Sequence, residues 1–139
     1  MKVTIIGGSG FIGTRIVDHF TQFKGYDFHI VDIRDSHFFN DITTIGDVRN
    51  QQQMDSAIAG TDLVILLAAQ HRDNVTPTSL YYDTNVGGMR TTLRAMERNG
   101  VKRILFFSSV AVYGINKDIP DETSPKAPFT HYGKSKWQA

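Results

Sequence analysis

The stretch Val-Thr-Ile-Ile-Gly-Gly-Ser-Gly-Phe-Ile-Gly at residues 3–13 decides the fold of this 139-residue chain. Its first four residues are β-branched, form too short a run for a helix, and predict a β-strand that ends in glycines. Apolar side chains then recur at helical spacing up to Phe20, and we expect this helix to end near Lys24 and Gly25. A strand, a glycine-rich turn and a helix in this order are typical of the first unit of a parallel α/β sheet.

The rest of the chain repeats this alternation of short apolar runs with amphipathic segments. Further strands are expected at residues 28–31, 43–45, 63–69 and 104–107, and further helices at 51–59, 79–98 and 131–139. The prolines of Gly114–Thr130 predict a loop there. We therefore expect one α/β domain over residues 1–139, a Rossmann-type doubly wound parallel sheet with strand order 3-2-1-4-5.

Composition and charge exclude several classes of function. Lys and Arg total 15 against 14 Asp and Glu, so the net charge of +1 creates no strong field toward nucleic acid or an anionic membrane. The chain has no cysteine and its histidines show no i, i+4 pairing, so we expect no metal site. No apolar run reaches the roughly 18 residues of a membrane span, and no signal peptide is evident. We expect a cytoplasmic protein without a nucleic-acid or membrane partner.

The glycine-rich turn has the spacing of a phosphate-binding loop. Gly8–Gly13 reads G-x-G-x-x-G, and Gly7, Gly10 and Gly13 also fit the wider pattern G-x-x-G-x-x-G. Glycine allows a tight turn, close approach of the backbone to a pyrophosphate, and close packing of helix on strand. The N–H groups of the following helix then face the phosphates. A glycine-rich turn without a ligand is the simpler interpretation of the pattern alone.

An acidic residue after the second predicted strand favours the ligand-binding interpretation. Asp32 lies 19 residues after Gly13. An acid about 20 residues beyond the glycines accepts hydrogen bonds from the ribose hydroxyls of a bound dinucleotide. Asp32 repels a 2′-phosphate, so NAD is favoured over NADP, a preference that Arg34 softens.

A second candidate group lies in the last third of the chain. Tyr132 and Lys136 are four residues apart on a predicted helix and so share one face. A Tyr side chain has a pKa of about 10, and a nearby ammonium favours its phenolate. Ser109, just after the fifth predicted strand, is placed to hydrogen-bond the same substrate oxygen. Taken alone, Tyr-x-x-x-Lys is more often an exposed amphipathic pair.

With these motifs the chain resembles the extended short-chain dehydrogenases/reductases, and within them the NAD-dependent epimerase/dehydratase family typified by UDP-glucose 4-epimerase. The resemblance runs from Met1 to Ala139. It rests on motifs that occur in the family's order: Gly7–Gly13, Asp32, Gly46–Arg49, Leu67–Ala69, Asn85–Gly88, Ser108–Gly114 and Tyr132–Lys136. Any one of them occurs by chance, whereas the ordered set is specific.

The resemblance implies roles for the residues that match these motifs. It implies a catalytic set of Ser109, Tyr132 and Lys136, in which Lys136 also holds the nicotinamide ribose of NAD. Asp47 is expected to accept a hydrogen bond from the adenine amine, and Asn85 to lie on the cofactor side. The implied cofactor contacts are Gly7, Gly10, Phe11, Ile12, Gly13, Asp32, Asp47, Val48, Leu67, Ala68, Ala69, Gln70, His71, Asn85, Tyr132 and Lys136.

The implied activity is that of an NAD-dependent nucleotide-sugar epimerase, most simply one acting on a UDP-sugar. Tyr132 would take the proton of a sugar hydroxyl while the hydride passes to NAD, which gives a keto-sugar. Family dehydratases carry an Asp-Glu pair after the serine position, where this chain has Val110-Ala111, so epimerase or simple oxidoreductase chemistry is favoured. Two alternatives are an NAD-binding module without turnover and a carbonyl or steroid-type reductase of the same family.

Family members are more than twice this long, so the chain is expected to be an N-terminal portion, truncated before the substrate-binding lobe and inactive when isolated. The helix that carries Tyr81 and Tyr82 resembles the family's dimer helix, and a homodimer is therefore expected.

Overall fold

Five parallel strands form a single sheet in the computed structural model, which describes residues 1–115 and 119–139. The strands are β1 (Lys2–Ile6), β2 (Asp27–Asp32), β3 (Thr43–Ile45), β4 (Leu63–Leu66) and β5 (Ile104–Phe106). Their order is β3-β2-β1-β4-β5, which confirms the predicted topology. Because the strand order reverses next to β1, a crevice is left at the carboxyl ends of β1 and β4.

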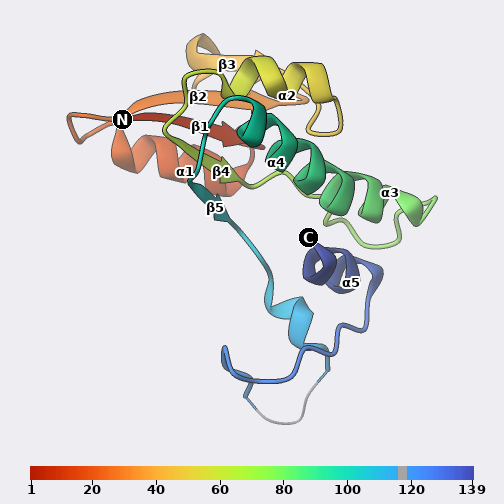
Figure 1. The fold of residues 1–139 in the computed structure, drawn as a ribbon. Helices are drawn as coiled ribbons and strands as arrows, with labels where there is room; N and C mark the ends of the chain where they lie inside the picture. Colours follow the sequence, from red (N-terminus) through yellow and green to blue (C-terminus); the bar gives the residue numbers. More distant parts are fainter. Residues whose placement is uncertain (116–118) are drawn as a thin grey trace.

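Helices cover both faces of the sheet, with α1 on one side and α2 and α4 on the other (Figure 1). The face under α1 buries Ile5 and Ile30 against Val17, and the opposite face buries Ile6 against Met54. The two layers explain why the strands are apolar without alternation. The helices are α1 (Phe11–Phe20), α2 (Gln51–Ile58), α3 (Ser79–Tyr82), α4 (Gly88–Arg98) and α5 (His131–Gln138), with 3₁₀ turns at Asn40–Ile42 and Val110–Tyr113.

Two elements end several residues earlier than their sequence patterns predict. Helix α1 ends at Phe20, and Gly25, with φ +102°, lies in the turn that follows. The expectation of a strand through Ala69 is wrong beyond Leu66. The N–H groups of Leu67 and Ala68 both donate to the carbonyl oxygen of Ile6, at 2.8 and 2.9 Å, so the regular pairing with β1 stops there. The residues after Leu66 are thereby free to form one wall of the crevice.

The single helix expected over residues 79–98 consists of three segments. Between α3 and α4 the chain forms a π-helical turn over Asp83–Gly87, which buries Asn85. A π-helical turn adds a residue to the helix and re-aims the side chains around it. The spacing of apolar residues predicts a helix over 79–98 but gives no signal for the π-helical turn, because the residues before and after the turn both keep helical spacing.

Helix α5 lies beyond the end of β5, beside the π-helical turn and apart from the helices that cover the sheet (Figure 1). Its first turn is capped by Thr130, whose Oγ1 accepts from the N–H of Gly133 at 3.0 Å. A Cβ on Gly133 would come within 2.5 Å of the carbonyl oxygen of Ala111, so α5 packs directly on the 3₁₀ turn. The predicted loop before α5 contains no further helix or strand in its described residues, and 116–118 lie outside them. None of the described helices is long and apolar enough to cross a membrane.

Candidate functional site

A cleft of about 860 Å³ opens at the carboxyl ends of the strands and extends to α5. Residues from the first and the last third of the chain meet in it, as the motifs predict. Of the residues singled out from the sequence, those that line the cleft are Gly7, Gly10, Phe11, Ile12, Gly13, Asp32, Asp47, Val48, Leu67, Ala68, Ala69, Gln70, His71, Tyr132 and Lys136.

The three motif glycines meet different steric demands. Gly7 has φ +84°, and a Cβ there would lie 2.4 Å from the backbone nitrogen of Ala68. A Cβ on Gly13 would lie 2.3 Å from the carbonyl oxygen of Gly8, so helix and turn pack without a gap. Gly10 has φ −78°, and the nearest atom to its Cβ position is 3.6 Å away. The protein needs Gly7 and Gly13 for its own packing, whereas Gly10 leaves open space in the cleft.

Asp32 connects the glycine turn to the end of β2. One carboxylate oxygen accepts from the N–H of Ser9 at 3.1 Å and the other from the N–H of Arg34 at 3.3 Å. The hydroxyl of Ser9 donates to the carbonyl oxygen of Arg34 at 3.0 Å. A carboxylate has about four acceptor sites. These two bonds fix the carboxylate in place and leave capacity for hydroxyl donors in the cleft.

Asp47 forms an ion pair with Arg49 at the start of α2. The Nε of Arg49 lies 2.9 and 3.0 Å from the two carboxylate oxygens, and Nη2 lies 2.5 Å from one of them. The side chain of Arg49 holds the pKa of the Asp47 carboxyl below its usual value. The N–H of Asp47 donates to Gln53 at 2.8 Å, which anchors the group to α2. The expected adenine acceptor is therefore ionised and held by a neighbour that also lines the cleft.

Tyr132 and Lys136 lie one turn apart on α5 and both line the cleft. Tyr132 is half-buried, whereas Lys136 is only 3% exposed. The Nζ of Lys136 lies 4.2 Å from the centre of the Phe106 ring, a cation–π contact that partly replaces water. Burial lowers the pKa of Lys136 to about 8. The charged form is still the majority at pH 7, and it is the form that favours a tyrosine phenolate nearby.

Asn85, an expected cofactor contact, is not among the residues that line the cleft. It is 3% exposed, and its Oδ1 accepts from the N–H of Gln70 at 2.7 Å. Its Nδ2 donates to the carbonyl oxygen of Gln70 at 3.1 Å and to Oγ of Ser135 at 2.8 Å. Both amide hydrogens and one acceptor site are thus used inside the protein.

Ser109 is also absent from the cleft lining, where its neighbour Ser108 is found instead. The Ser109 hydroxyl accepts from the N–H of Ala111 at 3.2 Å and caps the 3₁₀ turn. Accepting this bond leaves its own hydrogen available as a donor. The cleft also contains residues that the sequence analysis did not single out as contacts, among them Ser9, Arg49, Thr84, Phe107 and Ser108. Their position just after strand ends, or on the helix that follows, is the signal that identifies them.

Within the described ranges 1–115 and 119–139, no group of three or more His, Asp or Glu side chains is arranged to hold a metal ion.

The comparisons with known proteins agree with this geometry. The family model described as the NAD dependent epimerase/dehydratase family matches residues 3–139. The chain is 60% identical over 99% of its length to an Escherichia coli O157:H7 protein named N-acetyl-alpha-D-glucosaminyl-diphospho-ditrans,octacis-undecaprenol 4-epimerase, of which it covers 41%. It is 31% identical over 98% of its length to a UDP-glucose 4-epimerase of Lacticaseibacillus casei and covers 44% of that protein.

Solved structures show the same arrangement of the whole chain. A short-chain dehydrogenase/reductase superfamily protein from Agrobacterium tumefaciens with bound NAD has a TM-score of 0.90 and 26% identity. The match covers 99% of this chain and 42% of the Agrobacterium tumefaciens chain. The Bifidobacterium longum UDP-glucose 4-epimerase in complex with NAD+ and UDP has a TM-score of 0.85, 31% identity and coverages of 99% and 46%. The chain therefore spans less than half the length of these relatives, and it belongs to the NAD dependent epimerase/dehydratase family.

Proposed function

We propose that the chain binds NAD in this cleft and is part of a 4-epimerase that acts on a sugar carried by a diphosphate. The observation that carries the proposal is a single cleft lined by the glycine turn, Asp32 and Asp47 at one end and by Tyr132 and Lys136 at the other. The named relatives that are epimerases, and the solved relatives with bound NAD, support it.

The residues present fit NAD. Gly10 has no conformational need for glycine, so the open space beside it is suited to a ligand that approaches the backbone, as a pyrophosphate does. Phe11 and Ile12 begin α1, whose N–H groups would face those phosphates. Asp32 would accept from the adenosine ribose hydroxyls and Asp47 from the adenine amine. Val48, Leu67, Ala68, Ala69, Gln70 and His71 would line the cofactor's path.

The chemistry belongs to the α5 end of the cleft. Tyr132 would take the proton of the sugar C4 hydroxyl as the carbon becomes a ketone, and would return it when the hydroxyl re-forms. The Lys136 ammonium would stabilise the phenolate and hold the nicotinamide ribose. Ser109 would donate its remaining hydrogen to the same sugar oxygen after a change of rotamer toward the cleft. When bound, NAD supplies an acceptor that takes the C4 hydride and later returns it to the opposite face, with no net oxidation.

Two kinds of carrier for the sugar are considered, a polyprenyl group and a nucleotide, and both are attached to the sugar through a diphosphate. The Escherichia coli relative is named for a sugar on a polyprenyl diphosphate, and the Lacticaseibacillus casei relative for a UDP-sugar. Both present a sugar 1-diphosphate to the protein. The enzyme of which this chain is part is therefore expected to recognise the sugar and the diphosphate, and the substrate panel must distinguish the carriers.

The test uses the full-length enzyme and its Tyr132→Phe variant. Each is incubated with UDP-glucose, UDP-N-acetylglucosamine and N-acetylglucosaminyl diphosphoundecaprenol, and the released sugar is analysed for inversion at C4. Wild type is expected to invert one of the three without net NADH, whereas Tyr132→Phe loses at least about 100-fold in kcat because the proton acceptor is missing. Its NAD affinity is expected to stay within about twofold. Inversion that survives in Tyr132→Phe, or no inversion of any of the three, would refute the proposal.

The second candidate is the steroid-type reductase alternative taken in its oxidising direction, a steroid-type oxidoreductase, favoured by a mouse relative named sterol-4-alpha-carboxylate 3-dehydrogenase, decarboxylating, which is 31% identical over 97% of this chain. The same Tyr132 and Lys136 chemistry serves net oxidation when the product leaves as a ketone. Accumulation of NADH with a sterol substrate, in the absence of sugar inversion, would favour this candidate over the epimerase.

A further inference from the structure

The carboxylate of Asp47 is held by one residue. Among the residues that the structure describes, only Arg49 donates hydrogen bonds to it. The backbone N–H of Arg49 donates to Oδ1 at 2.9 Å, Nε lies 2.9 Å from Oδ1 and 3.0 Å from Oδ2, and Nη2 donates to Oδ2 at 2.5 Å. Three N–H groups thus occupy a carboxylate that has about four acceptor sites. One acceptor site remains for a donor in the cleft, which Asp47 lines.

The backbone around this carboxylate is fixed by its neighbours in the fold. The N–H of Gly46 donates to the carbonyl oxygen of Asp32 at 2.8 Å, which ties the segment to the end of β2. The N–H of Asp47 itself donates to Oε1 of Gln53 on α2 at 2.8 Å. Rotation of the Asp47 side chain is the freedom that remains, and the hydrogen bonds from Arg49 remove it.

The guanidinium of Arg49 sets the direction in which the remaining acceptor site points. A planar guanidinium that contacts both oxygens of a carboxylate fixes its plane, whereas a lysine ammonium is a point charge that does not. The side chains of Arg49 and Asp47 are 47% and 31% exposed, and an ion pair this exposed contributes little to stability. Loss of the Arg49 side chain would therefore leave the fold intact and the Asp47 carboxylate free to rotate.

An oriented carboxylate can distinguish one purine base from another. The side-chain hydrogen bonds of Arg49 lower the pKa of the Asp47 carboxyl, so it is ionised at neutral pH and can only accept hydrogen bonds. Adenine carries an exocyclic amine, which donates. Hypoxanthine carries a carbonyl oxygen in its place, which would face the carboxylate with no hydrogen between them. Adenine is therefore preferred only while the free acceptor site of Asp47 points at the base.

We propose that Arg49 is a positioning residue that acts through Asp47 to make the cleft select a dinucleotide whose base carries an exocyclic amine. This role rests on the proposed function, in which NAD binds in the cleft with its adenine at Asp47. It adds the residue that sets the choice of base, and it requires no contact between Arg49 and the base itself.

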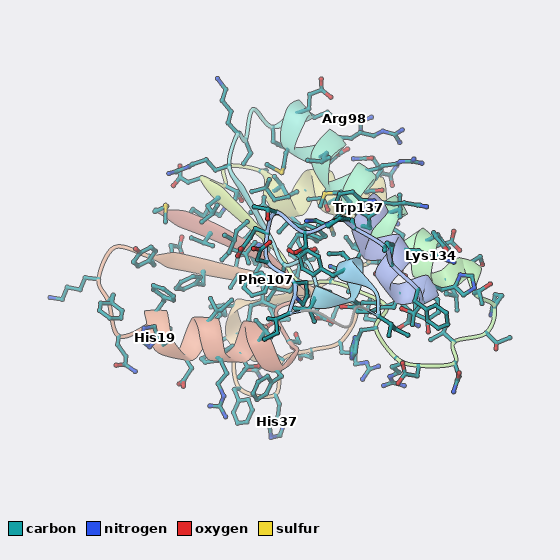
Figure 2. All side chains as sticks on the ribbon, turned by 90° about the horizontal axis from the view of Figure 1, so that it is seen from below. His19, His37, Arg98, Phe107, Lys134 and Trp137 are labelled. Carbon is teal, nitrogen blue, oxygen red and sulfur yellow. The ribbon has the colours of Figure 1, made fainter. Side chains whose placement is uncertain are left out.

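The test is isothermal titration of the chain with NAD and with nicotinamide hypoxanthine dinucleotide, in which a carbonyl oxygen replaces the adenine amine. The readout is the ratio of the two dissociation constants, because the rest of the dinucleotide is the same. The variants are Arg49→Met, Arg49→Lys, Asp47→Ala and the double variant Asp47→Ala/Arg49→Met, each verified as folded by circular dichroism. The matched control is Arg98→Met on α4 (Figure 2), which breaks the ion pair of Arg98 Nη1 with Asp55 Oδ2 at 2.6 Å. Neither partner of that ion pair lines the cleft.

Wild type is expected to bind NAD at least about 10-fold more tightly than the hypoxanthine dinucleotide, because a charge-assisted hydrogen bond to the amine is lost in the latter. In Arg49→Met and Arg49→Lys the ratio should fall to about 3-fold or less, since neither side chain can contact both oxygens of Asp47. Asp47→Ala should abolish the preference, and adding Arg49→Met to it should change nothing further, because Arg49 acts through Asp47. Arg98→Met should keep the wild-type ratio.

Other outcomes would overturn this role of Arg49. A wild-type ratio in Arg49→Met would show that Arg49 does not set the choice of base, and a wild-type ratio in Arg49→Lys would mean that only its charge matters. A preference for adenine that persists in Asp47→Ala would place the acceptor elsewhere, and an equal fall in Arg98→Met would show an effect that is not specific to the cleft. If wild type binds both dinucleotides equally, this role fails and NAD binding stands. If folded wild type binds neither, the proposed function fails and this role fails with it.

Discussion

Lys136 is a charged residue in a position that is almost closed to water, at 3% exposure. Burial lowers the pKa of Lys136 to about 8, and the Phe106 ring, 4.2 Å from Nζ, takes the place of part of the lost water. A hydrophobic side chain of similar length would suit this environment better. Tyr132 and Lys136 both line the cleft, and the proposed chemistry gives a cation a use there.

Replacing Lys136 with Met is expected to stabilise the fold. In the unfolded chain the lysine keeps a pKa near 10.5, against about 8 in the fold, so burying its charge destabilises the wild type fully below pH 8. This destabilisation disappears as pH rises through 8 toward 10.5. Lys136→Met should therefore raise the free energy of unfolding by about 1 to 3 kcal/mol at pH 7, with a difference that shrinks as pH rises.

Urea denaturation at several pH values measures this difference. The matched control is Lys134→Met on the exposed side of the same helix (Figure 2), which should show no such pH-dependent gain. A Lys136→Met protein that is less stable than wild type at pH 7 would mean that the ammonium is stabilised by the fold.

Asp32 is the residue whose removal tests cofactor choice. Asp32→Ala should weaken NAD binding by roughly 1 to 3 kcal/mol, because charge-assisted hydrogen bonds to the ribose are lost. Discrimination against NADP should fall as well, since the repulsion of a 2′-phosphate is gone. Calorimetric titration checks both, with Asp27→Ala, an exposed acid at the opposite end of β2, as control. NAD affinity unchanged by Asp32→Ala would remove Asp32 from the ribose site.

At the scale of elements, two glycines of the same turn are expected to have different roles: Gly7 in folding and Gly10 in NAD binding. Gly7→Ala forces φ +84° on an alanine and places its Cβ 2.4 Å from a backbone nitrogen, so it should destabilise the fold by about 2 to 5 kcal/mol. Gly10→Ala meets no atom closer than 3.6 Å and should cost no more than about 1 kcal/mol as a poorer N-cap. It should nevertheless weaken NAD binding at least about 10-fold, because its methyl group fills the space for the pyrophosphate.

Thermal unfolding and NAD titration of the two variants side by side check this. A Gly10→Ala protein that is stable and binds NAD as wild type would show that the turn is a packing device and not a phosphate site.

Elements with one strong local signal were predictable from the sequence. The strands, their order and the ends that carry Asp32 and Asp47 follow from short apolar runs separated by helices. The π-helical turn was not, because helical spacing continues on both sides of it; directly after the turn, Gly88 packs so closely on Val48 that a Cβ would lie 2.8 Å from its side chain. Asn85 is buried in this turn, and its partners Gln70 and Ser135 are 15 and 50 residues away, which a motif along the sequence does not contain.

The residues of the site likewise fall into those whose position could be predicted from the sequence and those whose position could not. Asp32 and Lys136 line the cleft because a strand end or a helix face fixes where they point. Ser109 lies outside the lining because the chain turns into a 3₁₀ segment at that residue, and its hydroxyl caps the turn. The two tyrosines of the predicted dimer helix are used within the chain: Tyr81 donates to the carbonyl oxygen of Arg72 at 2.6 Å, and Tyr82 contacts His131.

In the molecule as a whole, the cleft is assembled from segments far apart in the sequence. The sheet supplies the end with the glycine turn, Asp32 and Asp47, and α5, held at the π-helical turn and the 3₁₀ turn, supplies the Tyr132 and Lys136 end (Figure 1). The homodimer stays a prediction, and static light scattering of the full-length enzyme checks it: a monomer at all concentrations would contradict it.

The central claim is that one cleft binds NAD selectively with the residues described. The most direct measurement is isothermal titration of this chain with NAD and NADP side by side, after any copurified cofactor has been removed and folding verified by circular dichroism. The account predicts saturable binding of NAD with one site per chain and at least about 10-fold weaker binding of NADP, because Asp32 repels the 2′-phosphate. A folded chain that binds neither dinucleotide, or both equally, would contradict it.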